Sequence, residues 1–331
     1  MAKALMFQGT SSSAGKTIIS TALCRILKQD GFRVAPFKAQ NMSGNSFLTA
    51  SGDEISIAQA IQAEAAGVLP TRDMNPILLK PCGEMMSEVV IQGKTIGKLH
   101  AGEYRSRHLP EFRKAIICSY RRLSENYDVV VIEGAGSPVE VNLKDRDIVN
   151  MKVAKMAHSP VFLVADISLG GVFAAIVGTL ELLEEGERDM VAGFIINKFR
   201  GDISLLEPGL DFLEKKTGKP VLGVVPYVQN LSIAEEDLAA RSNKAGLTFG
   251  STEDCCGKGN PVRCRYPGNS KDTGNIENVL CKHPGKTRVK GSRKERREAA
   301  YDRLAQVVRQ SLDIGRIYSI ARLGSNFGNG C

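Results

Sequence analysis

Short apolar runs without polar alternation recur along the first two thirds of the chain. They are rich in β-branched residues and fall at 4–8, 33–38, 128–133, 160–166, 191–197 and 220–226. Strands of a parallel sheet covered on both faces show this pattern, because neither face meets water. We therefore expect buried parallel strands in these ranges.

Helical patterns separate these runs. The clearest has apolar residues at i, i+1, i+4, i+5, i+8 and i+9, namely Ile18, Ile19, Ala22, Leu23, Ile26 and Leu27, and Gly31 can close it. Residues 111–123, 172–183 and 203–215 show similar patterns. Because strands alternate with helices, the sequence predicts an α/β fold with an open, doubly wound, mostly parallel sheet. Its ligand site is expected at the carboxyl ends of the strands.

The pattern changes after Ala240. Residues 249–292 consist largely of Gly, Asn, Lys, Arg and Cys, a composition that buries too little apolar surface to order itself. One further helix is expected from the approximate stripe of Tyr301, Leu304, Ala305, Val308, Leu312 and Ile317. The sequence thus predicts three parts: an α/β domain at 1–245, an irregular basic segment containing cysteines at 246–295, and a C-terminal helix at 296–320.

Net charge separates the same parts. The chain of 331 residues carries a formal charge of +8, but residues 1–248 hold 28 basic and 28 acidic side chains, whereas residues 249–331 hold 16 and 8. The excess positive charge therefore belongs to the irregular segment and the final helix. No apolar run approaches the roughly 18 residues of a membrane span, and the N-terminus lacks the apolar core of a signal peptide. We expect a cytoplasmic protein without a membrane partner.

A glycine-rich loop follows the first predicted strand and opens the first predicted helix. It reads Gly9-Thr10-Ser11-Ser12-Ser13-Ala14-Gly15-Lys16-Thr17. Such a loop turns backbone N–H groups onto phosphate oxygens, and the helix N-terminus adds partial positive charge. We expect Lys16 to reach the β- and γ-phosphates of ATP, Thr17 to hold Mg²⁺, and Gly9, Thr10, Ser13, Ala14 and Gly15 to cradle the nucleotide. The alternative, a Gly/Ser-rich turn with a solvated lysine, is disfavoured by the strand and helix on either side.

Charged side chains follow two other predicted strands. Glu133 ends a buried strand directly before a Gly-Ala-Gly turn, where an acid can hold the Mg²⁺ that bridges the phosphates. Lys38 ends the strand at 33–38 and can neutralise charge on a transferring phosphoryl group at the same sheet edge. By position alone, Lys38 could equally be a surface lysine.

Three further polar residues are weaker candidates. Asp145 and Asp147 could supply a second metal site or orient a substrate, although their charge pattern also suits a solvated loop. Asn197 ends another predicted strand, where its amide could contact the adenine edge or form an Asx-turn.

With these residues assembled, the sequence closely resembles the synthetase domain of cobyric acid synthases, which are related to dethiobiotin synthetase within the phosphate-loop NTPase superfamily. The matching stretches cover residues 4 to about 243 and include FKAQNMSGNSF at 37–47, QAIQAEAAG at 59–67, EGAGSPVEVNLKDRDIVNM at 133–151 and FIINKFRGDISLLEPGLDFL at 194–213. One departure is Ser168-Leu169, where the family usually carries an Asp-Arg-like pair. A contact from that pair is therefore in doubt.

The resemblance implies ATP-dependent amidation of peripheral carboxylates on a corrinoid, from adenosylcobyrinic a,c-diamide to cobyric acid, through an acyl phosphate. It implies Lys16, Lys38, Glu133, Asp145 and Asp147 as catalytic residues. Family members continue into a glutaminase domain, which we do not find; only 296–318 resembles their last helix. We therefore expect ammonia to come from solution or from a separate glutaminase, and glutamine-dependent activity to be absent.

Alternatives from other classes remain. The chain could be another carboxylate-activating ligase of the dethiobiotin synthetase type, an inactive relic, or a regulatory ATPase whose basic tail binds nucleic acid or a membrane. Nucleic acid is disfavoured because aromatic residues do not interleave the basic cluster at 286–297. A zinc site at Cys255 or Cys256, Cys264, Cys281 and His283 is disfavoured because paired CxxC motifs are lacking. Homo-oligomerisation is compatible with the sequence.

Overall fold

The computed structural model describes residues 1–100, 102–103, 108–228 and 292–324. Its main sheet has the order β12-β11-β10-β1-β9-β2, and every neighbouring pair is parallel. The strands are β1 (Lys3–Gly9), β2 (Val34–Phe37), β9 (Val129–Glu133), β10 (Val161–Asp166), β11 (Val191–Phe199) and β12 (Val221–Pro226). All the strands expected from the apolar runs are confirmed.

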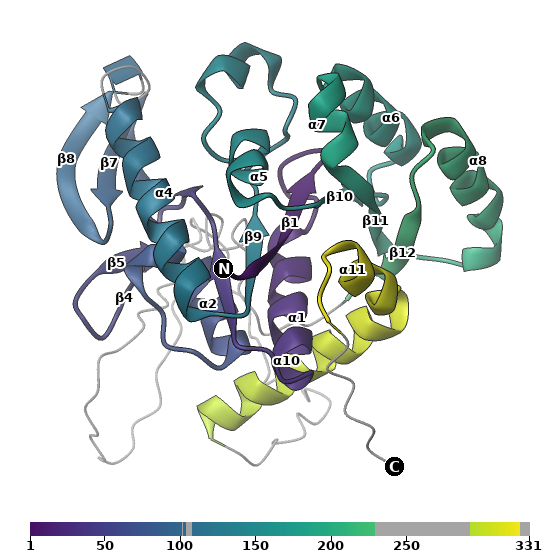
Figure 1. The fold of residues 1–331 in the computed structure, drawn as a ribbon, viewed down its shortest axis with the longest axis horizontal. Coiled ribbons are helices and arrows are strands. Elements are labelled where there is room, and N and C mark those ends of the chain that lie inside the picture. Colours follow the sequence, from purple (N-terminus) through teal and green to yellow (C-terminus); the bar gives the residue numbers. More distant parts are fainter. Residues whose placement is uncertain (101, 104–107, 229–291, 325–331) are drawn as a thin grey trace, which may run out of the picture.

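Helices cover both faces of this sheet (Figure 1). One face carries α4 (Leu109–Asn126), α5 (Met151–Ala157) and α6 (Val172–Leu182), and the other carries α1 (Lys16–Gln29), α10 (Arg293–Ser311) and α11 (Ile314–Ile320). The helix α2 (Ile57–Ala66) packs beside α1, and the short α7 (Glu185–Met190) precedes β11. The doubly wound architecture is confirmed. None of the helices within the described ranges is long and apolar enough to cross a bilayer.

Two helices differ from the prediction. The pattern at 203–215 begins with a 3-10 turn, η3 (Ile203–Leu205), and α8 (Glu207–Thr217) starts only afterwards, with Pro208 in its first turn. The expected final helix is two helices, α10 and α11. The chain breaks between them because Leu312 is extended and bridges Gly223 of β12, after which the Asp313 side chain accepts the Arg316 N–H and caps α11.

The apolar pattern missed a second sheet between residues 40 and 100. Its order is β3-β6-β7-β8, with β3 parallel to β6 and the other pairs antiparallel. The strands are β3 (Gln40–Met42), β6 (Ile77–Gly83), β7 (Met86–Ile91) and β8 (Lys94–His100), with a separate hairpin of β4 (Ser46–Leu48) and β5 (Glu54–Ser56). The 3-10 turns η1 (Arg72–Met74) and η2 (Val141–Arg146) complete the described elements.

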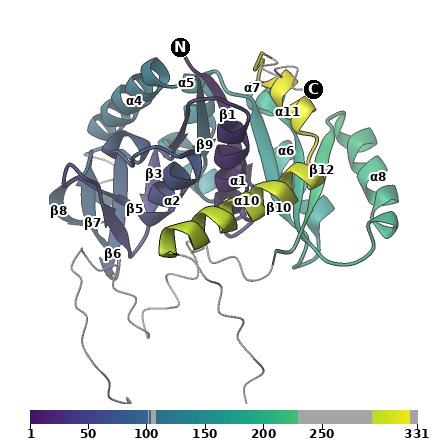
Figure 2. The same ribbon diagram turned by 90° about the horizontal axis from the view of Figure 1, so that it is seen from below.

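The C-terminal helices complete the core on the α1 face. In Figure 2 α10 crosses α1 and reaches β12. Tyr301, Leu304 and Val308 are at most 2% exposed and share a hydrophobic cluster with α1. Arg25 of α1 contacts Glu298 and Asp302 at 2.7 Å each. Residues 229–291 lie outside the described residues, so the expected domain boundary near 245 and most of the irregular segment 246–295 are not tested.

We predict that Leu304→Ala lowers the free energy of unfolding by about 2–5 kcal/mol, because it leaves a cavity in a close-packed core. The side chain of Leu304 is fully buried. The matched control is Leu205→Ala, since Leu205 is 84% exposed; we expect a change within about 0.5 kcal/mol. Chemical denaturation measures both. Equal effects of the two substitutions would contradict the assignment of α10 to the core.

Candidate functional site

The glycine-rich loop joins β1 to α1 in a conformation that requires both of its glycines. Gly15 has φ of 94°, and a Cβ atom there would lie 2.0 Å from the Asn197 side-chain nitrogen. A Cβ atom on Gly9 would lie 2.6 Å from the Ser11 carbonyl oxygen and 2.8 Å from Lys16 Nζ. A side chain at either position would therefore clash with these atoms and displace the loop. The Lys16 ammonium lies over the loop, donating to the Ser11 carbonyl at 3.0 Å and the Gly136 carbonyl at 3.1 Å.

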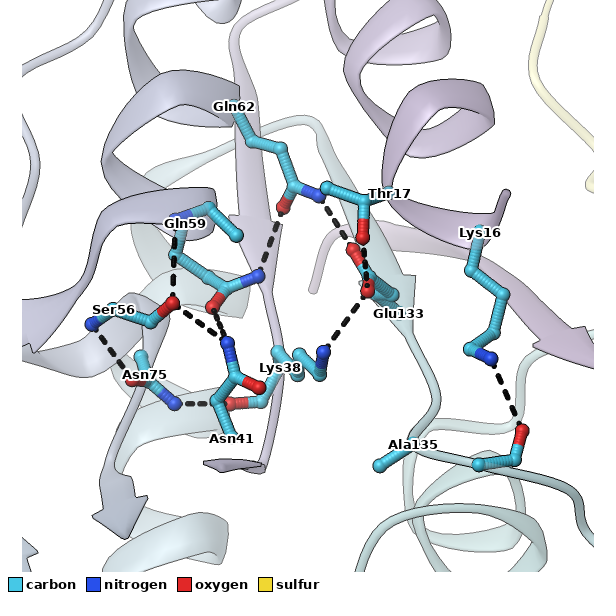
Figure 3. Close-up of polar contacts among 12 residues, drawn as sticks. Lys16, Thr17, Lys38, Asn41, Ser56, Gln59, Gln62, Asn75, Glu133 and Ala135 are labelled. Carbon is cyan, nitrogen blue, oxygen red and sulfur yellow. Dashed lines mark hydrogen bonds and ion pairs between the residues drawn. The ribbon is translucent and has the colours of Figure 1, made fainter. Parts of the chain in front are cut away.

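Glu133 stands at the centre of the site and is only 1% exposed. Its Oε1 atom accepts from Thr17 Oγ1 at 2.8 Å and from Lys38 Nζ at 3.0 Å (Figure 3). Strand register explains the meeting: Phe7 of β1 pairs with Glu133, and Phe37 of β2 pairs with Ile132. Parallel strands in this register end at one edge of the sheet. The structure thus brings together three side chains that the sequence proposed separately.

A buried amide network, which the sequence reasoning missed, lies behind Glu133. Gln62 of α2 donates from Nε2 to Glu133 Oε2 at 2.6 Å, and Gln59 of the same helix donates to Gln62 Oε1 at 3.3 Å. Asn41 of β3 donates to Gln59 Oε1 at 3.2 Å and to Ser56 Oγ at 2.6 Å. The available signal was two glutamines three residues apart in a helix that otherwise holds only alanine, isoleucine and Glu64.

Asn75 supports the same region from the strand side. Its amide donates to the Lys38 carbonyl at 3.1 Å and to the Ile77 carbonyl at 2.9 Å, while its oxygen accepts the Ser56 N–H at 3.0 Å. Asn75 is 1% exposed. These bonds satisfy backbone groups where the chain leaves β2, so they hold Lys38 at the sheet edge.

The carboxyl end of β11 braces the other side of the loop. The amide of Asn197 donates to the Ala14 carbonyl at 2.9 Å, and Lys198 donates to the Ser13 carbonyl at 2.7 Å. Lys198 also pairs with Asp166 of β10 at 2.9 Å. Burial raises the pKa of Asp166, but hydrogen bonds from Ser168 and Lys198 outweigh it, so the pKa lies below its usual range. Ser168, at the position that departs from the family, thus supports Asp166.

The two weaker aspartates lie apart from Glu133. Asp145 is exposed, and only its backbone carbonyl makes a described contact, with Lys152 Nζ at 2.8 Å. The Asp147 carboxylate accepts the N–H groups of Val149 and Asn150 at 2.9 Å and of Lys152 at 3.0 Å. It therefore holds the start of α5 and does not join the Glu133 cluster.

The oxygen atoms that a metal ion could use at the loop do not form a cluster of acidic side chains. Within the described ranges, no group of three or more His, Cys, Asp and Glu side chains could hold a metal ion. The cysteines considered for zinc, at 255, 256, 264 and 281, lie outside those ranges. A metal at the loop would rely on Thr17, Glu133 and oxygens of the bound nucleotide.

Two cavities adjoin at the loop. One, of about 430 Å³, is lined by the phosphate loop, Lys38, Asn41 and Glu133. The second, of about 280 Å³, has a more apolar wall that includes Phe112 and Ile148. Both share Met42, Ala135 and Gly136. A ligand at the loop would therefore adjoin a second, more apolar space across these three shared residues.

Comparison with known families agrees with this geometry. Residues 5–239 match the family CbiA, described as the CobQ/CobB/MinD/ParA nucleotide binding domain. The chain belongs to this family. It therefore has the phosphate-loop fold of a nucleotide-binding family, and the loop, Thr17 and Glu133 line one cavity at the edge of its main sheet.

Curated relatives narrow the comparison. The chain is 56% identical over 254 residues to cobyric acid synthase from Desulforamulus reducens, covering 77% of this chain and 50% of that protein. It is 61% identical over 233 residues to cobyric acid synthase from Sorangium cellulosum, covering 70% and 45%. The resemblance inferred from the sequence is confirmed. The chain spans about half the length of these curated relatives.

Solved structures are more distant. The signal recognition particle receptor FtsY from Elizabethkingia anophelis matches with 18% identity and a TM-score of 0.43, covering 73% of this chain and 65% of that one.

The lowered pKa of Asp166 predicts that this residue stabilises the fold in a pH-dependent way. Because its folded pKa is lowered, the ionised form stabilises the fold above the unfolded pKa of about 4, and this contribution is lost as pH falls through the folded pKa. We expect Asp166→Asn to lower the free energy of unfolding by about 1–3 kcal/mol at pH 7. The deficit should shrink below pH ~4.

Denaturation across this pH range measures the effect. The exposed Asp211 of α8 supplies the control Asp211→Asn, which should behave like the wild type at every pH. A deficit of Asp166→Asn that stays constant down to pH ~2 would contradict the assignment.

Proposed function

We propose that this chain activates peripheral carboxylates of a corrinoid with ATP for amidation, as the synthetase part of a cobyric acid synthase. The observation that carries the proposal is the cluster of Thr17, Lys38 and Glu133 at the mouth of a phosphate loop, beside a second cavity. The identity of 56–61% to proteins named cobyric acid synthase supports the substrate class. Adenosylcobyrinic a,c-diamide is the proposed acceptor and cobyric acid the product.

The donor set fits Mg²⁺. Thr17 offers a hydroxyl oxygen and Glu133 a carboxylate oxygen, 2.8 Å apart, and hard oxygen ligands beside phosphates are what Mg²⁺ prefers. When bound, the ion would neutralise charge on the β- and γ-phosphates. We propose Thr17 and Glu133 as its protein ligands.

The chain's own residues position the transfer. A carboxylate oxygen of the acceptor attacks the γ-phosphorus, the bond from that phosphorus to the β,γ-bridging oxygen breaks, and ADP leaves. Lys16, Lys38 and backbone N–H groups of the loop after Thr10 stabilise the negative charge on the phosphoryl oxygens. Ammonia then attacks the acyl carbon of the resulting acyl phosphate, so that phosphate and a proton leave and an amide remains.

The positions of Asp145, Asp147 and Asn197 suggest different roles for these three residues. Asp147 lines the second cavity, so it is better placed than the exposed Asp145 to orient the acceptor. We retain Asn197 as the proposed adenine contact because its side chain lies against the phosphate loop at the carboxyl end of β11. We propose a cytoplasmic enzyme, with ammonia supplied from solution or by a separate glutaminase.

The direct test incubates the chain with ATP, Mg²⁺, adenosylcobyrinic a,c-diamide and either ammonium or glutamine, and weighs the products. We expect amides with ammonium, each lowering the corrinoid mass by about one dalton and accompanied by one ADP. Glutamine should give amides only when a glutaminase is added. ADP formation without any change in corrinoid mass would count against the proposed substrate.

Lys38→Met should lower kcat for amidation at least 100-fold, because removing one charge from a preorganised site costs about 3–4 kcal/mol in the transition state. The control is Lys94→Met, since Lys94 has a 64% exposed side chain that pairs with Asp53 and does not line the cavity of the loop. It should retain wild-type kcat. A Lys38→Met protein that folds and keeps more than a tenth of wild-type kcat would remove Lys38 from the catalytic residues.

A further inference from the structure

Four buried side chains form a continuous hydrogen-bonded relay that ends on Glu133. It runs from Asn41 to Gln59, from Gln59 to Gln62 and from Gln62 to Glu133, with distances of 3.2, 3.3 and 2.6 Å. Figure 3 shows the amides following one another from β3 across α2 to the end of β9. All four side chains are at most 2% exposed.

The relay has one direction. An ionised carboxylate only accepts hydrogen bonds, so Gln62 must present its NH₂ group to Glu133. Its oxygen then faces Gln59, which must donate, and the oxygen of Gln59 in turn faces the donating amide of Asn41. Rotating any one amide by half a turn would place two oxygens or two NH₂ groups against each other. Each residue therefore determines the orientation of the next.

The two carboxylate oxygens of Glu133 have different hydrogen-bond donors. Gln62 occupies Oε2, whereas Oε1 faces Thr17 Oγ1 and Lys38 Nζ in the cavity of the phosphate loop. Without Gln62 the carboxylate could rotate about its terminal torsion, which is a broad, soft one. A packing role alone does not explain the relay, because apolar side chains would fill the same buried volume without needing partners.

We propose that Gln62 is a positioning residue that turns Glu133 so that Oε1 points at the metal position beside Thr17, with Gln59 and Asn41 holding Gln62 in turn. This inference rests on the proposed role of Glu133 in the site. Asn41 also lines the cavity, so the relay connects the cavity wall to the carboxylate.

The test measures the dissociation constant of a fluorescent ATP analogue in EDTA and in Mg²⁺. The ratio of the value in EDTA to the value in Mg²⁺ isolates the contribution of the metal to binding. For Gln62→Met, which keeps the volume and removes the donor, we expect this ratio to fall about tenfold. The dissociation constant in EDTA should stay within twofold of the wild type. For Gln59→Met we expect a fall of about threefold, since it removes only the group that orients Gln62.

The matched control is Gln92→Met. Gln92 is a partly buried glutamine whose amide donates to Ser119, away from the loop; its ratio should equal that of the wild type. Thermal unfolding verifies that each variant is folded. If Gln62→Met does not fold, the ratio measured for Gln59→Met decides whether the relay positions Glu133.

Wild-type ratios in both relay variants would overturn the inference. So would equal weakening in Mg²⁺ and EDTA, which would indicate a purely structural role, and so would a wild-type protein whose affinity ignores Mg²⁺. A chain that shows the expected ratios but amidates no corrinoid would disprove the proposed function and leave the role of Gln62 intact.

Discussion

The buried carboxylate of Glu133 is the constraint around which this domain is organised. An isolated charge in the interior costs many kcal/mol, and it is tolerated only when charge partners and hydrogen-bond donors surround it. Here the donors come from three different elements: Thr17 from α1, Lys38 from the end of β2 and Gln62 from α2. Each element must be in place before the charge is satisfied, so the site and the fold depend on each other.

The same logic extends outward from the loop. Its carbonyl groups at 13 and 14 accept from Lys198 and Asn197, and Asp166 pairs with Lys198 from the neighbouring strand. The loop is therefore held in place by hydrogen bonds from the carboxyl end of β11. A preorganised loop of this kind does not need to reorganise when charge develops on a bound phosphate.

The C-terminal helices contribute to this arrangement from a distance. They cover the outer face of α1, the helix that begins at Lys16, and Arg25 of α1 is buried against acidic residues of α10. The Asp30 carboxylate just after α1 accepts from Arg309 and Tyr318. The helix that presents the phosphate loop is thus packed on both sides, which limits its movement relative to the sheet.

The amino-acid sequence by itself determined the main sheet, the helices that flank it and the candidates Lys16, Thr17, Lys38 and Glu133. Buried parallel strands and amphipathic helices follow from local periodicity, and phosphate loops follow from local spacing. It did not reveal the second sheet, because its strand β8 is largely exposed and shows no buried apolar run, and because the turn at Gln92-Gly93 depends on two residues with positive φ. It also predicted one continuous last helix, whereas the bridge between Leu312 and Gly223 divides it into two.

Only the tertiary structure decided which side chains meet. Strand register brought Lys38 within 3.0 Å of Glu133, whereas the 3-10 turn η2 places Asp145 on the exposed surface. The bond of the relay from Gln62 to Glu133 joins residues that are 71 positions apart in the chain. Periodicity describes how one element faces the core, but a hydrogen bond between two elements depends on how they pack, so no local pattern could predict it.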